Sequence, residues 1–516
     1  MTEVRNRTVG DVLLNYREWA KTDWFKIHKC VCNTNGKGRG DEEHEIWRLE
    51  DVDKNLGDLT TKTVLEPNGG REKRIIEKEL RLYKWKVEKL LGMKIKPEVR
   101  RRNTEHKDSE MEKRIMKMKC KWRDWVIIER DKNNGAMVVA CPMWYRRKLM
   151  DTFDWTKWRA NYQRVQLTED QILKKWKKDN RKREKKMTWS DKGSLPYCYG
   201  IPKEKDIEKM RPIISYTHHP LRRQFNKVGR VLLFMLKKSK IESLTLWRID
   251  DVEKELMKLN EIIKDWRKVE EIDLKMEVFD IKEMYTNLPH REIVEAVHWI
   301  IDIFQEQYGD LVTIMGNRSK DIKTGKGKYG RLVSGDEVLD TVCMDLDNAV
   351  FKCGTILAIQ TIGIPMGSPM SPALAIITCA RAESKMFDML RGNAKFHAIR
   401  YIDDIWVCTL KRKDERFGNT QEILKYYDRY LKVEKEREGN QVRYLDRTIS
   451  WDGKELRSIA YNKNSESLIV EGIRKFRNIL PDFSYNKQKV KKAIIIGRFF
   501  RIQIGTMKPQ DVFWQG

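Results

Sequence analysis

Two stretches decide the fold: MEVFDIKEMYTNLP at residues 276–289 and RYIDDIWVC at residues 400–408. The first predicts a short apolar strand that ends at Asp280, followed by a turn and an amphipathic helix. The second predicts a hairpin that carries Asp403 and Asp404 at its turn. Together these patterns predict three carboxylates at the ends of strands.

An Asp-Asp pair alone is weak evidence for catalysis, because such pairs also occur in surface turns. Here the pair is flanked by apolar residues, with Tyr401 and Ile402 before it and residues 405–407 after it. This pattern predicts a buried hairpin rather than a solvated loop. Acids held next to each other in this way repel unless cations lie between them.

Three carboxylates can hold two divalent metal ions, which is what phosphoryl transfer to a hydroxyl requires. Magnesium prefers oxygen ligands and keeps several waters, so Asp280, Asp403 and Asp404 with substrate oxygens would complete its coordination. We therefore expect two Mg²⁺ ions as the cofactor, with Mn²⁺ as a substitute, and no other cofactor.

Between the two acidic segments, residues 360–383 read QTIGIPMGSPMSPALAIITCARAE. This stretch predicts a loop rich in Gly and Pro that leads into a long apolar helix. Glycines such as Gly367 allow the backbone to approach a flat ligand closely. The alternative interpretation is an ordinary loop that enters a core helix.

Two segments upstream are predicted to form strand pairs. Residues 122–155 contain two β-rich runs around a turn at residues 133–135. Residues 195–225 place Lys203 and Arg211 on either side of a polar loop between extended segments. Two cations on such a hairpin could bind a triphosphate.

The basic segment 174–189 interleaves Trp176 and Trp189 with cations. Such a pattern fits a groove that binds phosphates and stacks on bases. A solvated helix, with or without a nuclear-import role, explains it equally well.

Residues 1–124 are highly charged and mostly helical in pattern, as in the run at residues 77–94. His28, Cys30 and Cys32 lie close together in this region. A structural zinc site usually has four ligands in two spaced pairs, and no second pair follows here. The spacing therefore does not favour zinc.

The composition indicates a polyanionic partner. Lys and Arg number 105 against 77 Asp and Glu, a net charge of +28, which attracts a phosphate backbone without specifying DNA or RNA. Nine scattered cysteines and an N-terminus without an apolar signal core favour a reducing compartment, the nucleus or cytoplasm, and not secretion. No apolar run approaches the length of a membrane span, so no membrane partner is expected.

Three segments resemble motifs A, B and C of reverse transcriptases, and the resemblance is strongest to the Penelope-like elements, relatives of telomerase reverse transcriptase. FDIKEMYTNLP (279–289) resembles motif A, GIPMGSPMSP (363–372) motif B, and RYIDDIWV (400–407) motif C. The fingers block YCYGIPKEKDIEKMRPIIS (197–215) and a Leu-Asp pair at 445–446 match further parts of the family pattern. The resemblance spans about residues 125–505.

The resemblance implies a role for each matching residue. Asp280 and Asp403 match the acids that bind both metals, and Asp404 completes the triad. Tyr285 matches the bulky side chain that excludes a 2′-hydroxyl. The other matches are Lys203 and Arg211 on the triphosphate, Gln360, Gly367 and Ser368 near the template base and incoming nucleotide, and Lys432 as a general acid for pyrophosphate.

The resemblance also implies an α+β right-hand polymerase that uses an RNA template, a DNA primer and dNTPs. We expect a basic helical N-terminal extension at 1–124, fingers at 125–270, a palm at 271–450 and a short thumb at 451–516. No GIY-YIG endonuclease signature follows the thumb, although typical Penelope-like proteins carry one.

Three alternatives stay open. A telomerase-like protein or a group II intron maturase would share the same acids. An RNA-dependent RNA polymerase would have a smaller or hydrogen-bonding residue in place of Tyr285. A retired polymerase that serves as an RNA-binding protein would keep the fold without turnover.

Overall fold

A computed structural model describes residues 8–461, apart from 29, 33–44, 53–108, 132–135, 155–160, 184–186, 269–270, 317–320, 391–395, 413–417, 419 and 429–430, and beyond 461 only residues 493 and 497. The predicted helix at 77–94 and most of the predicted thumb lie outside the described residues. The chain divides into two compact units, which are described separately: a first unit (Met1–Thr152, Tyr199–Pro212 and Asn462–Arg501) and a second unit (Phe153–Cys198, Ile213–Tyr461 and Ile502–Gly516). The predicted fingers segment contributes residues to both units.

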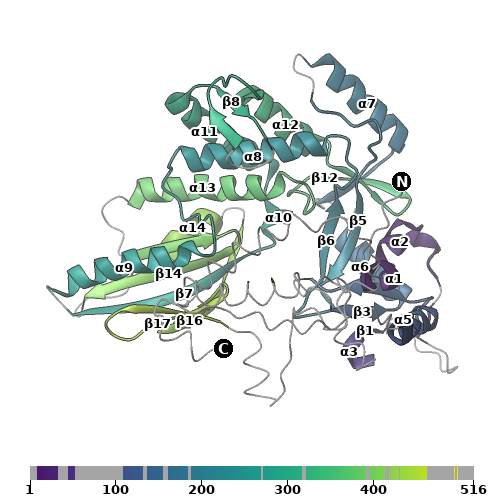
Figure 1. Cartoon of the computed structure of the whole chain (residues 1–516), viewed down its shortest axis with the longest axis horizontal. Helices are drawn as coiled ribbons and strands as arrows, with labels where there is room; N and C mark the ends of the chain where they lie inside the picture. The colour runs from purple at the N-terminus through teal and green to yellow at the C-terminus, as the bar shows by residue number, and fades with distance from the viewer. Residues whose placement is uncertain are drawn as a thin grey trace, which may run out of the picture. The chain divides into compact units, whose positions relative to one another are not determined.

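The first unit contains a three-stranded antiparallel sheet in the order β1-β3-β2 (Figure 1). Strands β2 and β3 are the two β-rich runs that the sequence predicted, so the pairing is confirmed. Apolar residues of the sheet, such as Ile127 and Val139, share a buried cluster with Val9 of α1 and Ile115 of α5. The elements are α1 (Val9–Leu13), α2 (Tyr16–Lys21), η1 (Trp24–Lys26), β1 (Ile46–Arg48), α3 (Leu49–Val52), α5 (Ser109–Lys121), β2 (Val126–Glu129), β3 (Met137–Ala140) and α6 (Pro142–Thr152).

The second unit is organised around a four-stranded antiparallel sheet in the order β13-β14-β7-β15. Alternate residues of β7, from Ile272 to Val278, are buried in one apolar cluster with Trp406 of β14 and Leu256 of α9. The small sheet β16-β17-β18 contributes to the same cluster. These elements are α9 (Asp251–Arg267), β7 (Ile272–Lys282), β13 (Phe396–Tyr401), β14 (Asp404–Arg412), β15 (Lys432–Gly439), β16 (Gln441–Tyr444), β17 (Arg447–Trp451) and β18 (Leu456–Ala460).

Helices α8, α11, α12 and α13 pack against one another within the second unit (Figure 1). The long helix α11 buries Ile293, Val297, Ile300 and Phe304, a spacing that places apolar side chains on one face. Helix α13 begins at Ser371, directly after the Gly- and Pro-rich loop, as the sequence predicted. The helices are α8 (Arg222–Lys238), α10 (Met284–Asn287), α11 (His290–Tyr308), α12 (Gly335–Asp347), α13 (Ser371–Leu390) and α14 (Gln421–Asp428).

Two further sheets complete the described part of the chain. A five-stranded sheet has the order β4-β12-β11-β5-β6, and its strands β5 and β6 each have residues in both units. A three-stranded sheet, β10-β8-β9, lies between α11 and α12 in the sequence. The remaining elements are β4 (Tyr162–Val165), α7 (Glu169–Lys182), β5 (Tyr197–Pro202), β6 (Met210–Ser215), β8 (Leu311–Ile314), β9 (Ile322–Thr324), β10 (Arg331–Ser334), β11 (Val350–Cys353) and β12 (Ile356–Gln360).

The structure corrects the interpretation of the basic segment on α7. Trp176 is 1% exposed, and its indole Nε1 donates a hydrogen bond to Asn348 Oδ1 at 2.8 Å. Because this ring is buried in the second unit, it is not available to stack on a base. The described residues contain no helix with both the length and the apolar character needed to span a bilayer.

A buried ion pair joins α13 to the central sheet. Arg400 and Glu383 are almost fully buried, and the Arg400 Nε donates to a Glu383 carboxylate oxygen. The same carboxylate accepts from the Tyr427 hydroxyl and from the Leu244 backbone N–H, the latter at 2.8 Å. Burial disfavours the charge of Arg400, but the Glu383 carboxylate raises the pKa of this guanidinium well above its usual value. Each buried polar group of this network therefore needs the others as its hydrogen-bond or ion-pair partners.

We predict that Glu383→Ala lowers the free energy of unfolding by about 3–5 kcal/mol, because it leaves a buried charge without its counter-ion. Urea titration of the purified chain measures this loss. Lys174→Ala is the control, since its ion pair with Asp170 is exposed, and such a pair contributes less than about 1 kcal/mol. Equal losses in the two variants would contradict the prediction.

Candidate polymerase site

Strand pairing brings the three predicted acids together in the second unit. Asp280 on β7 is directly opposite Asp404 on β14, and the backbone N–H of Ile281 donates to the Asp403 carbonyl at 2.9 Å. Directly opposite residues of an antiparallel pair have side chains on the same face, about 5 Å apart at Cβ. The predicted hairpin is buried as expected, since residues 405–407 are fully buried.

A lysine that the sequence analysis missed lies against these acids. Lys282 Nζ is 2.6 Å from Asp280 Oδ2, 3.7 Å from Glu436 Oε1 and 4.0 Å from Glu434 Oε2. Burial lowers the pKa of Lys282, but its hydrogen bond and charge interaction with Asp280 raise it more, so the net shift is upward. Residues two apart on a strand share a face, and this period is the sequence signal that would have paired Lys282 with Asp280.

The turn between β13 and β14 is held by buried polar contacts. Ile402 has φ of 58°, a left-handed conformation that is costly for a β-branched residue. The Ile402 carbonyl accepts from Arg400 Nη1 at 2.9 Å, and the Asp404 carbonyl accepts from the Tyr444 hydroxyl at 3.2 Å. These contacts fix the backbone on both sides of Asp403.

The loop before α13 packs on the segment that carries Tyr285. The Ile364 N–H donates to the Tyr285 carbonyl at 2.6 Å, and the Gly363 N–H donates to the Leu288 carbonyl at 2.8 Å. Gly363 has φ of 82°, and a Cβ there would lie 2.6 Å from backbone atoms of Tyr285 and Thr286. Glycine is therefore required where motif A and motif B touch.

Gly367 and Ser368 have packing contacts inside the same unit. A Cβ on Gly367 would lie 2.0 Å from the Ile214 carbonyl oxygen of β6. Ser368 is 5% exposed and donates to Asp345 Oδ2 at 2.8 Å, while the Tyr216 hydroxyl donates to Asp345 Oδ1 at 3.0 Å. The structure thus gives both residues a role in positioning the loop, and their contact with a nucleotide stays a prediction.

Gln360 ends β12 and is 1% exposed. Its amide Nε2 donates to the Ile362 carbonyl at 3.0 Å, whereas its buried Oε1 has no hydrogen-bond partner. An unsatisfied buried acceptor is costly, and a ligand donor is one way to satisfy it. This observation fits the predicted contact of Gln360 with a base or nucleotide.

The two predicted fingers cations belong to the first unit. Lys203 follows β5, and its backbone N–H donates to the Lys209 carbonyl at 2.8 Å across the hairpin. Arg211 on β6 has Nη2 2.9 Å from Asp131 Oδ2, and its buried Nε has no hydrogen-bond partner. The predicted hairpin with its two cations is therefore present.

Lys432 begins β15, on the opposite side of β7 from the acidic hairpin. It is opposite Lys282 in the strand register, and its Nζ lies 2.6 Å from Glu434 Oε1. Glu434 in turn is directly opposite Asp280. Lys432 is thus two residues from the strand position that faces the first acid.

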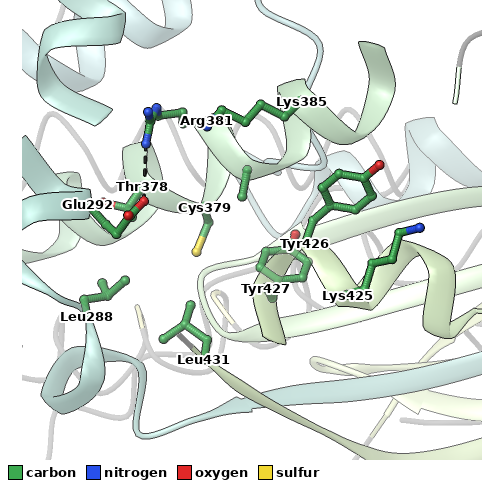
Figure 2. Close-up of a pocket in the computed structure, with 11 residues that line it drawn as sticks. Leu288, Glu292, Thr378, Cys379, Arg381, Lys385, Lys425, Tyr426, Tyr427 and Leu431 are labelled. Carbon is green, nitrogen blue, oxygen red and sulfur yellow. Dashed lines mark hydrogen bonds and ion pairs between the residues drawn. The ribbon is translucent and has the colours of Figure 1, made fainter. Parts of the chain in front are cut away.

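A separate pocket of about 230 Å³ lies between α11, α13 and α14 (Figure 2). Cys379 and Tyr427 are among its lining residues, and Arg381 forms an ion pair with Glu292 at its edge. None of the predicted site residues is among the described residues that line it.

No family model matches the chain, and no curated protein matches it. The structure is similar to apo telomerase from Candida tropicalis, with 15% identity over 79% of this chain and 70% of that chain and a TM-score of 0.46. It is also similar to telomerase from Candida albicans in complex with a TWJ fragment of telomeric RNA, with 13% identity, 69% and 58% coverage and a TM-score of 0.46.

A third similar structure is the BmCPV RNA-dependent RNA polymerase at elongation state, with 8% identity, 57% and 23% coverage and a TM-score of 0.31. Likenesses with TM-scores below 0.5 are too distant to assign a function. A functional proposal for this chain therefore depends on the residues of its own site.

We predict a pH-dependent stability that comes from Asp345. Burial raises the pKa of this carboxyl to about 6, while hydrogen bonds from Ser368 and Tyr216 lower it. The folded state then holds a proton that the unfolded state releases between about pH 4 and pH 6, so stability falls as pH rises through that window and is level above it. Relative to Asp345→Asn, the wild type should lose on the order of 3 kcal/mol between pH 4 and pH 7 in urea titrations.

Ser368→Ala is the matched control. Because it removes a hydrogen bond that favours the carboxylate, it should move the loss of stability to higher pH. If the free energy of unfolding varied with pH in the same way in the wild type and in Asp345→Asn, the pKa of the Asp345 carboxyl would not be raised in the folded state.

Proposed function

We propose that the chain is an RNA-directed DNA polymerase, a reverse transcriptase that extends a primer 3′-hydroxyl with dNTPs on an RNA template. The observation that carries this proposal is the register of the central sheet, which pairs Asp280 with Asp404 and places Asp403 at the adjoining turn. The charge of +28 supports a nucleic-acid partner.

The donor set fits two magnesium ions. Asp280, Asp403 and Asp404 offer carboxylate oxygens, the ligands that magnesium prefers. When bound, such ions would activate the attacking 3′-oxygen and stabilise the leaving pyrophosphate. The side chain of Asp280 is 21% exposed, so solvent and substrate can reach it.

Four cationic side chains would act in the proposed reaction without binding a metal ion. Lys282 neutralises Asp280 before substrate binds and must move to release that carboxylate. Lys203 and Arg211 would bind triphosphate oxygens, as the resemblance implies, and Arg211 would exchange its contact with Asp131 for them. Lys432 would donate a proton to the departing pyrophosphate.

The finer assignment within this class rests on the sequence motifs. These motifs support a Penelope-like element, and a telomerase-like polymerase uses the same acids. We propose that the four-stranded sheet β13-β14-β7-β15 is the palm of a right-hand polymerase, because it carries all three acids. The Gly- and Pro-rich loop before α13, which bonds the Tyr285 carbonyl, would then line the nucleotide site.

Primer extension on poly-rA/oligo-dT with dTTP and Mg²⁺ tests the proposal. We expect the wild type to extend the primer and the double variant Asp403→Asn, Asp404→Asn to lose at least about a hundredfold in rate, because metal binding supplies several kcal/mol of transition-state stabilisation. Asp273→Asn is the matched control: this exposed acid is on the same strand as Asp280 and pairs with Lys411.

The primer-extension rate of the Asp273→Asn control should stay within about twofold of the wild-type rate, since an exposed ion pair contributes little to stability. If the wild type binds the hybrid tightly but does not extend it, the chain is a binding protein on a polymerase fold and the proposal is wrong.

Tyr285 gives a second test, which concerns the sugar. Replacement by alanine should raise incorporation of ribonucleotides relative to deoxynucleotides by at least about tenfold, because the ring no longer occupies the space of a 2′-hydroxyl. Tyr285→Phe, which keeps the ring, should retain the discrimination. Competition assays with rUTP and dTTP measure both ratios, and unchanged discrimination in the alanine variant would contradict this role.

A further inference from the structure

Two neighbouring cysteines and a third that is distant in the sequence meet in the first unit. The sulfur atoms of Cys30, Cys32 and Cys141 all lie within 4.8 Å of one another. Cys30 and Cys32 precede β1, whereas Cys141 follows β3 and precedes α6. The pairing of β1 with β3 (Figure 1) sets Ile46 opposite Ala140 and so places Glu45 beside Cys141.

The spacing of the sulfurs matches a metal site rather than a disulfide. Cys141 Sγ and Cys30 Sγ are 3.9 Å apart, while a disulfide requires about 2.05 Å. Thiolates bound to one tetrahedral zinc at about 2.3 Å lie about 3.8 Å from each other. All nine cysteines of the chain are thiols in the structure.

The backbone around the cluster is arranged as it is around metal-bound thiolates. The Glu45 N–H donates to Cys32 Sγ at 3.3 Å, and the Glu45 carbonyl accepts from the Cys141 N–H at 2.9 Å. An N–H directed at sulfur stabilises the thiolate and orients it as an outer-shell contact does. One residue thus bonds the sulfur of Cys32 and the backbone of Cys141.

The cluster also has a route for a metal. Cys30 is exposed, Cys32 half-buried and Cys141 buried. A pocket of about 420 Å³ is lined by Val31, which lies between the two nearby cysteines, and by Pro142, which follows Cys141. Because Cys30 is exposed, an ion can reach the cluster from solvent. His28, the histidine nearest to Cys30 in the sequence, lines the same pocket.

We infer that Cys30, Cys32 and Cys141 bind one zinc ion as thiolates, which leaves the fourth position of a tetrahedral site for water or a further side chain. Thiolate ligands select zinc among the common divalent ions, and binding releases the thiol protons to solvent without a change of oxidation state. The ion would tie residues 30–32 to the start of α6, and Cys32 and Cys141 are 109 positions apart in the sequence. The sequence alone did not show the site, because its third ligand is remote and stands alone.

The test is metal analysis of the full chain, purified without a histidine tag after expression with zinc. We expect about one zinc per chain in the wild type and less than about 0.2 in Cys30→Ser and in Cys141→Ser. Cys120→Ser is the matched control, because Cys120 is exposed on α5 and outside the cluster; it should keep about one zinc. Cys30 is exposed, so its variant remains informative if Cys141→Ser fails to fold.

Cobalt binding gives a readout that does not need the variants. Cobalt added to the metal-free wild type should produce intense sulfur-to-metal charge-transfer absorption, which zinc then abolishes. Either of two results would overturn the inference: a wild type that holds no zinc and shows no such band, or a disulfide between two of these cysteines in mass spectrometry without reductant.

Discussion

The pairing of β7 with the strands on both of its sides is the constraint on which the site depends. β14 sets Asp404 opposite Asp280, and β15 sets Glu434 opposite the same residue. Two carboxylates about 5 Å apart repel by about 3 kcal/mol at an effective dielectric constant of about 20. A fold that accumulates such repulsion at one point requires cations there, and among the described residues Lys282 forms an ion pair with Asp280.

The acids keep this arrangement because the interior beneath them is rigid. Arg400 bonds the Ile402 carbonyl on one side and the Glu383 carboxylate on the other, so it connects the acidic turn to α13. Tyr427 of α14 and Leu244 bond the same carboxylate. Removing the charged groups of such a buried network from water is costly. The network therefore fixes the positions of its members more than it adds to the free energy of unfolding. It holds Ile402 in a conformation that the residue would not adopt in isolation.

The sequence predicted the parts of the molecule that local patterns determine. The hairpin at 400–408, the loop that enters α13 and the strand pair around residues 133–135 depend on apolar runs broken by turn residues, and the structure confirms them. The strand expected to end at Asp280 continues to Lys282. Features that depend on distant contacts were missed: Trp176 was interpreted as a surface residue, although Asn348 binds its indole in the interior.

Ser368 and Cys141 also have partners that the sequence could not predict. Nothing near Ser368 in the sequence reveals that Asp345, more than twenty residues earlier, accepts its hydroxyl hydrogen bond. Cys141 has two sulfur neighbours, Cys30 and Cys32, that lie more than a hundred residues earlier, which no local pattern specifies. Motifs therefore predicted the candidate acids of this chain, while the contacts that position each side chain came only from the fold. Such contacts matter for the proposed site, since three carboxylates hold two ions productively only when the backbone that carries them is fixed.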